Sequence, residues 1–494
     1  MKKIIVIGSG FAGLSAASFM AKEGWEVTLL EKHLLPGGRA QKFLAEGFTF
    51  DMGPSWYWMP DVFERYFGSF GKKVTDYYSL KRLDPSYSVY YPDNRMDIPA
   101  DYNALKDLFE SREKGSGEQL DKFLAEAAYK YEVGVNKLVY KPSLSVTEFL
   151  DIDLAKGILK LDVFTDMKKH ISKYFTHPHI VELMEFPVLF LGALPQHIPA
   201  LYSLMNYADI KLGTWYPEGG LNTVASSMHK LAEELGVKCL FGHNVQSINI
   251  DNGKAVSVTT DKETFYADAV ISAADYHFTE TKLLPEKSRT YSDAYWEKRV
   301  MAPSSLLYYV GINKKLKNVH HHSLFFDVDF NQHGKEIYDT PMWPTEPLFY
   351  VCASSVTDET VAPSGCENLF FLIPVAAGLA GDNEKLRDDY FYKIVKRFEE
   401  QTGEEIKDSI IYKRSYSVSD FVHDHNAFKG NAYGLANTLM QTAIFKPALK
   451  SKKVSNLFYA GQLTVPGPGV PPSLISGEVA AMQVIKQFKN ANQQ

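Results

Sequence analysis

The N-terminal stretch KKIIVIGSGFAGLSAASFMAKEGWEVTLLEK, residues 2–32, determines how the first part of the chain folds. An apolar run before the glycines is typical of a buried parallel strand, and a second strand is expected just before Glu31. Between them, Gly8, Gly10 and Gly13 form the pattern G-x-G-x-x-G. These glycines allow a sharp turn, let the backbone approach a pyrophosphate and bring a helix close to the sheet. Glu31 follows about 20 residues later, where a carboxylate accepts ribose hydroxyls, so the stretch predicts a dinucleotide-binding unit.

Lys2 and Lys3 before an apolar run also fit the start of a secretory signal peptide. Such a peptide would carry three glycines in its apolar core and would continue directly into a strand without a convincing cleavage site. We therefore expect no signal peptide.

The loop after Glu31, KHLLPGGR at 32–39, indicates which dinucleotide is bound. Paired glycines bring the backbone close to a flat or anionic ligand, and Arg39 can pair with phosphate. The alternative is an ordinary turn with a surface arginine. The Gly-Gly-Arg element resembles the one that follows the ribose-binding acid in flavoprotein oxidases of the glutathione-reductase-like superfamily. This resemblance favours FAD over a nicotinamide dinucleotide.

The length and composition limit the kinds of protein that this chain can be. A chain of 494 residues exceeds one compact core, so two or three domains are expected. The net charge of −6 gives no reason to expect nucleic acid binding. Cys239, Cys352 and Cys366 are scattered and form neither a redox pair nor a zinc pattern, which fits a reducing cytoplasm. The aromatic fraction of 13% suits a long apolar cavity, although aromatic residues also fill ordinary cores.

Two apolar segments leave alternatives open. No run of about 18 apolar residues predicts a spanning helix, and the nearest, 186–204, is interrupted by three prolines. It is interpreted either as buried helices that line a cavity or as an element that dips into a membrane. The loop Trp56–Met59 must be buried, or it lines a ligand or membrane surface.

Two later segments again show strands and helices like those of the N-terminal unit. Residues 215–275 read as helix and strands that rejoin the N-terminal unit, and the strand at 457–460 leads through a Gly/Pro-rich loop into a final helix. The N-terminus of that helix offers N–H groups to a flavin oxygen. No second G-x-G-x-x-G follows a strand, so no nicotinamide site is predicted. Residues 318–345 are expected to form irregular surface, with His320, His321 and His322 exposed and no metal bound.

Five segments together resemble the bacterial-type carotenoid desaturases, the phytoene and dehydrosqualene desaturase family. They are FTFDMGPSWYWMP (48–60), LFLGALPQHIPALYSL (189–204), WYPEGGLNTVASSMHKLAEELGV (215–237), SVSDFVHDHNAFKGNAYGLANTLMQTAIFKP (417–447) and FYAGQLTVPGPGVP (458–471). The resemblance covers nearly the whole chain. Two positions depart from it: Val465 stands where many members have His, and Lys446 where many have Arg. Any acid–base role of that His is therefore unavailable here.

The resemblance implies an α/β fold with a split Rossmann-type FAD-binding domain of glutathione-reductase-like, amine-oxidase-like architecture. This domain is expected at 1–85, 215–300 and 430–494, with a helical membrane and substrate lobe at 86–214 and an inserted α+β substrate domain at 301–429. The residues expected to bind FAD are Gly8, Gly10, Phe11, Ala12, Gly13, Glu31, Lys32, Gly38, Arg39, Gly53, Pro54, Ser55, Val245, Gly461, Gly469, Val470 and Pro471.

The family resemblance also implies an activity, the insertion of double bonds into a long isoprenoid polyene. Phytoene is the first choice of substrate, with a hydroxylated or monocyclic carotene or a C30 analogue as alternatives. The enzyme is expected to lie peripherally on the cytoplasmic side of a membrane and to pass electrons to a quinone or oxygen. Asp275, Asp420, His423 and His425 are candidate proton acceptors, but no catalytic base is assigned. Two other classes of the same fold stay open, a flavin amine oxidase and a non-enzymatic prenyl-binding chaperone.

Overall fold

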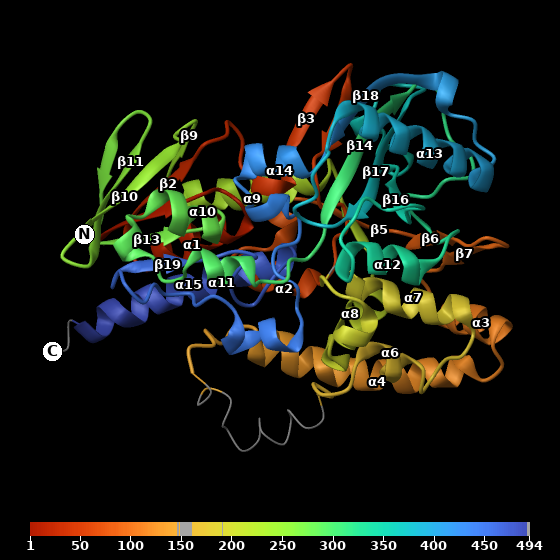
Figure 1. Ribbon diagram of the computed structural model, residues 1–494, viewed down its shortest axis with the longest axis horizontal. Coiled ribbons are helices and arrows are strands. Elements are labelled where there is room, and N and C mark those ends of the chain that lie inside the picture. The colour runs from red at the N-terminus through yellow and green to blue at the C-terminus, as the bar shows by residue number, and fades with distance from the viewer. Residues whose placement is uncertain (146–147, 149–160, 190, 492–494) are drawn as a thin grey trace.

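The computed structural model describes residues 1–145, 148, 161–189 and 191–491 (Figure 1). In the view of Figure 1, a parallel sheet with its helices lies on the left and a larger mixed sheet lies at the upper right. A group of helices covers the lower right. Phe190, part of the apolar segment discussed above, lies outside the described residues.

The parallel sheet has five strands in the order β19-β13-β1-β2-β9. Its helices α1 and α15 pack against each other, and a Cβ on Gly477 of α15 would lie 2.1 Å from the carbonyl oxygen of Ala12 in α1. This close crossing requires glycine. The strands are β1 (Lys3–Ile7), β2 (Glu26–Glu31), β9 (Lys238–Phe241), β13 (Ala269–Ser272) and β19 (Leu457–Tyr459), and the helices α1 (Phe11–Lys22), α9 (Leu221–Glu234) and α15 (Val470–Ala491). The sheet thus joins three distant parts of the chain.

The mixed sheet has seven strands in the order β18-β14-β17-β16-β15-β6-β7. Helix α13 (Glu384–Thr402) covers one face, where Phe391 and Phe398 pack on the sheet. The strands are β6 (Tyr87–Tyr90), β7 (Arg95–Ile98), β14 (Ser304–Ile312), β15 (His322–Phe325), β16 (Phe349–Cys352), β17 (Glu367–Val375) and β18 (Ile410–Tyr416).

Two sequence predictions are wrong for this sheet. The pair β6 and β7 belongs to it, because β6 pairs in parallel with β15, whereas the sequence placed residues 86–98 in the helical lobe. Residues 318–345 are not irregular surface, since they contain the buried strand β15 and helix α12 (Phe330–Tyr338).

The lower helices are α3 (Tyr102–Arg112), α4 (Ser116–Val133), α6 (Met167–Ile171), α7 (Pro178–Leu189) and α8 (Leu204–Tyr207). Within the apolar segment 186–204, the side chains of Phe186, Val188 and Ile198 are almost completely buried. The segment therefore packs inside the protein, and the alternative of a membrane-dipping element is wrong for these described residues. None of the helices in the described part of the chain combines the length and apolar character needed to cross a membrane.

Smaller elements connect the two sheets. They are the hairpin β3 (Lys42–Ala45) and β4 (Phe48–Asp51), the pair β5 (Leu80–Arg82) and β8 (Trp215–Pro217), and the three-stranded sheet β10 (Val245–Asp251), β11 (Lys254–Thr260) and β12 (Thr264–Tyr266). The other α-helices among the described residues are α2 (Pro60–Gly68), α10 (Tyr276–Phe278), α11 (Asp293–Glu297) and α14 (Val418–His425).

Candidate active site

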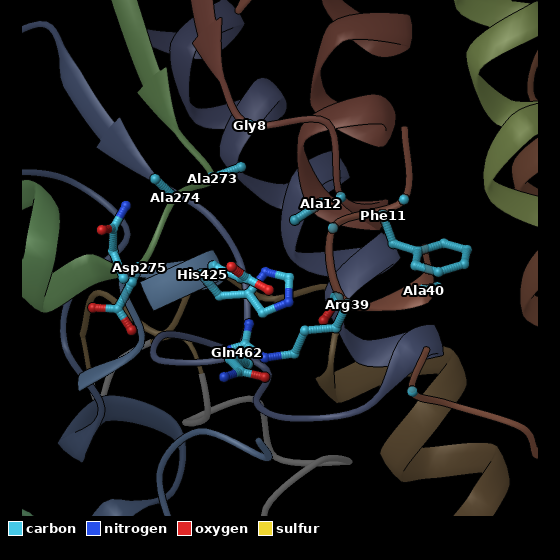
Figure 2. Close-up of a pocket in the computed structure, with 18 of the residues that line it drawn as sticks. Gly8, Phe11, Ala12, Arg39, Ala40, Ala273, Ala274, Asp275, His425 and Gln462 are labelled. Atoms are coloured by element: carbon cyan, nitrogen blue, oxygen red, sulfur yellow. The ribbon is translucent and has the colours of Figure 1, made fainter. Parts of the chain in front are cut away.

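A first cavity, of about 270 Å³, lies at the carboxyl ends of the parallel strands. Ligands of open α/β sheets bind at this edge. Gly8 follows β1, and Ala273 and Ala274 follow β13, so the three residues lie side by side along one wall (Figure 2). The side chains of Arg39 and Gln462 extend into the same space from other segments.

Glycines bring two parts of the backbone close together in this cavity. A Cβ on Gly10 would lie 3.9 Å from the Cα of Gly38. Helix α1 begins directly after Gly10 and has no side-chain cap, so the N–H groups of its first turn face the cavity without a side-chain acceptor. Such a helix N-terminus attracts a phosphate anion. Gly13 has a different role, because a Cβ there would lie 1.8 Å from the carbonyl oxygen of Gly8.

The carboxylate of Glu31 is fixed at the far end of the cavity by three hydrogen bonds. One oxygen accepts from the backbone N–H of Ser9 at 2.7 Å and from its hydroxyl at 2.8 Å. The other accepts from the backbone N–H of His33 at 2.9 Å. Glu31 is buried, and these bonds hold its oxygens in one orientation toward a ligand.

Arg39 is the central cation of the cavity (Figure 2). It donates to the backbone carbonyl of Asn431 at 3.2 Å. The side-chain amide of Gln462, with its oxygen turned toward the guanidinium, accepts a second hydrogen bond from Arg39 at 3.0 Å. The Nε atom of Arg39 is buried and has no hydrogen-bond partner among the described residues. Burial lowers the pKa of Arg39, and the nearby carboxyl of Asp275 opposes that shift. An anionic ligand would satisfy the unpaired donor.

Asp275 and His425 are titratable groups of the same cavity. Burial raises the pKa of Asp275 to about 6, although its carboxyl accepts from the backbone N–H groups of Phe278 and Phe428. Burial, reinforced by the charge of Arg39, holds the pKa of His425 well below its usual value. A neutral imidazole therefore lies next to the guanidinium.

Most of the residues expected to bind FAD line this cavity, and three lie elsewhere. Gly13 supports the turn from behind, while Ser55 and Pro471 line a second cavity. The residues in the first cavity are Gly8, Gly10, Phe11, Ala12, Glu31, Lys32, Gly38, Arg39, Gly53, Pro54, Val245, Gly461, Gly469 and Val470.

The sequence did not identify several other lining residues. Ala273 and Ala274 follow β13, and the small-residue end of that predicted strand was their one signal. Asn244 and Gln462 lie in loops without a recognisable pattern. Of the four candidate proton acceptors, Asp275 and His425 line the cavity, but Asp420 pairs with Arg387 and His423 is exposed.

These features fit a flavin dinucleotide. Glu31 offers a carboxylate for ribose, the start of α1 and Arg39 offer donors for the pyrophosphate, and Gly10 lets both approach closely. At the other end, Gly469 and Val470 at the start of α15 offer a second helix N-terminus. The cavity thus offers hydrogen-bond donors to the phosphates of a dinucleotide and an acceptor to its ribose hydroxyls.

A second cavity, of about 330 Å³, adjoins the first and is mostly apolar. Three residues of the loop Trp56–Met59 line it, and the four side chains of that loop are buried or half-buried rather than facing a membrane. The helical lobe contributes Val135, Leu138, Val139, Pro187, Leu191, Leu201, Tyr202, Leu204 and Met205. Val465, at the position where the resemblance predicts a His, is another apolar wall residue.

The two cavities meet at six shared residues, Gly53, Pro54, Leu372, Tyr433, Gly469 and Val470. A smaller apolar cavity between the mixed sheet and α12 shares Leu372 and Tyr433 with both, and Tyr350 with the second. An elongated apolar molecule in the second cavity can therefore continue past the end of the first cavity into the third.

Polar groups are few along this apolar path. The hydroxyl of Tyr350 lies 2.8 Å from the hydroxyl of Ser55 and 2.6 Å from Nδ1 of His322. Both His321 and His322 are buried, so the expectation that they are exposed is wrong. The reason is that β15 is an interior strand of the mixed sheet, between β16 and β6.

A buried lysine lies behind the apolar wall, against Gly467. Nζ of Lys446 and Oδ1 of Asn437 have no hydrogen-bond partners among the described residues, and both lie against Gly467, which lines the second cavity. Burial lowers the pKa of Lys446 to about 7.

The chain is similar to known proteins over nearly its full length. The model of the family "Flavin containing amine oxidoreductase" matches residues 11–485. The carotenoid 3,4-desaturase of Haloarcula japonica is 40% identical over 487 residues, covering 98% of each chain. The zeta-carotene-forming phytoene desaturase of Myxococcus xanthus is 30% identical over 492 residues, covering 98% of this chain and 94% of that protein.

Solved structures share the fold. An oxidoreductase from Methanosarcina mazei superimposes with a TM-score of 0.62 at 17% identity, covering 98% of this chain and 100% of the other. Cyclohexylamine oxidase from Brevibacterium oxydans does so with a TM-score of 0.59 at 14% identity, covering 99% of each chain. At these identities the similarity is one of fold alone.

Proposed function

The chain belongs to the carotenoid desaturase family of flavin-containing amine oxidoreductases, and from this premise we propose that it dehydrogenates a long polyene. Its cofactor is FAD. The observation that carries the proposal is the junction of the two cavities: a site with the donors for a dinucleotide opens, at Gly53, Pro54 and Leu372, into an apolar path.

The cofactor, when bound, accepts two electrons and one hydrogen from the polyene. The protein itself contributes by positioning the substrate relative to the cofactor. Apolar walls exclude water and hold a C–H bond of the substrate at the junction, while the backbone at Gly469 and Val470 lies against the same point from α15. Arg39, Glu31 and the start of α1 would hold the other end of the dinucleotide.

Phytoene is the proposed substrate, converted to lycopene-type products. A later carotene, hydroxylated or monocyclic, is the second candidate, consistent with the 40% identity to a carotenoid 3,4-desaturase. A C30 analogue is the third, consistent with the 30% identity to a 4,4'-diapophytoene desaturase of Staphylococcus haemolyticus.

Expression in bacteria that make phytoene, with chromatography of the pigments, tests this proposal. Lycopene-type products support phytoene as substrate. Unchanged phytoene, with conversion of a later carotene in a parallel strain, moves the proposal to that substrate. A protein that is inert toward every polyene and oxidises an amine would overturn it, as would one that purifies without flavin.

We further propose that the enzyme attaches to the surface of a membrane. Leu144, Leu439, Met440 and Phe445 are exposed apolar side chains. They adjoin Ser143, Thr442 and Ala443, which line the second cavity. A water-insoluble polyene can enter from lipid at this patch, which we call the entrance patch.

Electrons leave the reduced cofactor, in this proposal, to a membrane quinone or to oxygen. The sequence contains no second dinucleotide fingerprint and no redox cysteine pair. Anaerobic turnover with and without an added quinone distinguishes the two acceptors.

A further inference from the structure

Desaturation removes a proton as well as a hydrogen with its electron pair, and the apolar path holds few groups that can receive it. Lys446, a buried amine, is separated from the second cavity by Gly467 and does not line it. Ser55 and Tyr350 do line it. Ser55 follows Pro54, which lies at the junction with the cofactor cavity, and Tyr350 lies where the second and third cavities meet.

We propose that Ser55, Tyr350 and His322 form a proton relay that takes up the proton lost by the polyene. The inference rests on the proposed function. The three groups form a continuous chain, with 2.8 Å from Ser55 Oγ to Tyr350 Oη and 2.6 Å from Tyr350 Oη to His322 Nδ1. Proton transfer needs this contact distance between each donor and acceptor.

The direction of the relay follows from the number of protons. In the relay, the tautomer of His322 with its proton on Nε2 accepts the single proton of the Tyr350 phenol at Nδ1. Ser55, which lines the cavity, then donates to Tyr350, and its Oγ keeps the capacity to accept a proton.

The transfer balances as follows. One C–H bond of the polyene gives its hydrogen and electron pair to the cofactor. The electron pair of the neighbouring C–H bond becomes the new C=C bond, and its proton passes to Ser55 Oγ. The proton of Ser55 moves to Tyr350, and that of Tyr350 to His322, which becomes an imidazolium. After the product leaves and water enters the cavity, the same three atoms return the proton to that water.

The environment suits these roles. Burial, reinforced by His321, holds the pKa of His322 well below its usual value, so the imidazole is neutral before reaction. Burial raises the pKa of Tyr350 well above its usual value, so the phenol keeps a proton and acts as a conduit. A weak base suffices, because a C–H bond next to an allylic cation is strongly acidic.

A second, independent feature supports a transient charge on His322. The ring of Trp56 is stacked on the imidazole, with centroids 4.1 Å apart and planes inclined by 12°. An aromatic face stabilises a cation placed over it, so the stack favours the imidazolium, to which no carboxylate of the described residues is bonded.

The test compares Ser55→Ala, Tyr350→Phe and His322→Phe with Tyr308→Phe. Tyr308 is a matched control, because it is a buried tyrosine of the same sheet whose hydroxyl donates to the backbone carbonyl of Arg387 outside the cavities. His322→Phe keeps a ring for the stack on Trp56. In anaerobic single turnovers, each relay variant should reduce its flavin about 10²–10⁴-fold more slowly than the parent. Flavin content, melting temperature and polyene affinity should stay near the parental values, and Tyr308→Phe should match the parent throughout.

Nitrogen NMR of histidine-labelled protein gives a readout that is independent of turnover. His322 should have an unprotonated Nδ1 in the resting protein, and Tyr350→Phe should change its signal. A protonated Nδ1 would overturn the relay. Parental rates in all three variants, or a loss of polyene binding that matches the loss of rate, would do so too. Stoichiometric zinc in the purified protein would also overturn it, because a metal bound to His321, His322 and Cys352 would occupy the acceptor. If instead no polyene reduces the parental flavin, the proposed function fails.

Discussion

Ser9 and Glu31 are joined by two hydrogen bonds to a single carboxylate oxygen, from the backbone N–H at 2.7 Å and from the hydroxyl at 2.8 Å. Ser9 lies inside the G-x-G pattern and Glu31 at the end of the next strand. The glycine-rich turn and the ribose-binding acid therefore form one hydrogen-bonded unit before any ligand arrives. This pre-organisation reduces the conformational freedom that binding has to remove.

Glu31→Gln should weaken the retention of FAD. The amide keeps the size of the side chain but removes the negative charge that both the ribose hydroxyls and the Ser9 donors favour. We expect a loss of roughly 1–3 kcal/mol in FAD binding, measured by titrating apoprotein with FAD. Ser9→Ala, which removes one of the two bonds and leaves the carboxylate in place, should lose less. An equal affinity of Glu31→Gln and the parent would contradict the role of the carboxylate.

Gly10→Ala and Gly13→Ala should fail in different ways. Gly10 has a φ of −70° and its Cβ would find no atom closer than 3.9 Å, so the apoprotein should fold normally. The new methyl group would occupy the approach to the pyrophosphate, and FAD affinity should fall at least about tenfold. In Gly13→Ala the Cβ would overlap the carbonyl oxygen of Gly8 at 1.8 Å, so the protein should accumulate in the insoluble fraction.

Circular dichroism and FAD titration of the two soluble or refolded proteins distinguish these outcomes. If Gly10→Ala melts several degrees below the parent as apoprotein, its effect is structural and the prediction is wrong.

Local sequence was sufficient for the first unit of the fold. The strand, the helix and the acid at Glu31 follow one another within 31 residues, and each has a pattern that depends on near neighbours. The strand β13 and the final helix were also legible, because their apolar runs end at small residues and glycines. The split of the parallel sheet into three segments came from the family resemblance, since spacing alone does not reveal which strands pair.

The wrong or missing predictions have a common cause, which is long-range pairing and packing. His321 and His322 were expected at the surface, because consecutive histidines without an acidic partner at helical spacing are more often exposed than bound to a metal. Strand β15 is buried because it pairs with β6, more than 200 residues earlier, and that pairing has no local signal. The same holds for Gln462, which reaches the cofactor cavity from a loop positioned by long-range packing.

Charge in the entrance patch should reduce binding to membranes. Met440 and Phe445 have 65% and 48% of their surface exposed, and burial of such a side chain in lipid contributes about 1.5–3 kcal/mol. Met440→Glu with Phe445→Glu should lower co-sedimentation with phospholipid vesicles by at least about tenfold. Tyr266→Glu is the control, because Tyr266 is 74% exposed on β12, in the separate three-stranded sheet. Equal losses in both proteins would point to a general charge effect and contradict the patch.

Lys446→Met should stabilise the protein in a pH-dependent way. Burial lowers the pKa of Lys446 to about 7 in the folded protein, whereas a lysine of the unfolded chain titrates near 10.4. Below pH 7 both states carry the charge, and the folded protein bears the full cost of burying it. As the pH rises from 7 toward about 10, the unfolded chain binds more protons than the folded one, so the cost declines. Methionine fills the same space without a charge.

The advantage of Lys446→Met should therefore be largest near pH 6, at roughly 3–5 kcal/mol, and should shrink steadily toward pH 10. Calorimetric melting of the FAD-loaded proteins across this range measures it as a difference in melting temperature. Lys453→Met is the control, because Lys453 is exposed and its replacement removes the same charge without relieving burial. A constant difference at every pH would show that packing, and not the buried ammonium, is responsible. A variant less stable than the parent at pH 6 would show that Lys446 is charged and paired within the folded protein, contrary to its lack of a partner among the described residues.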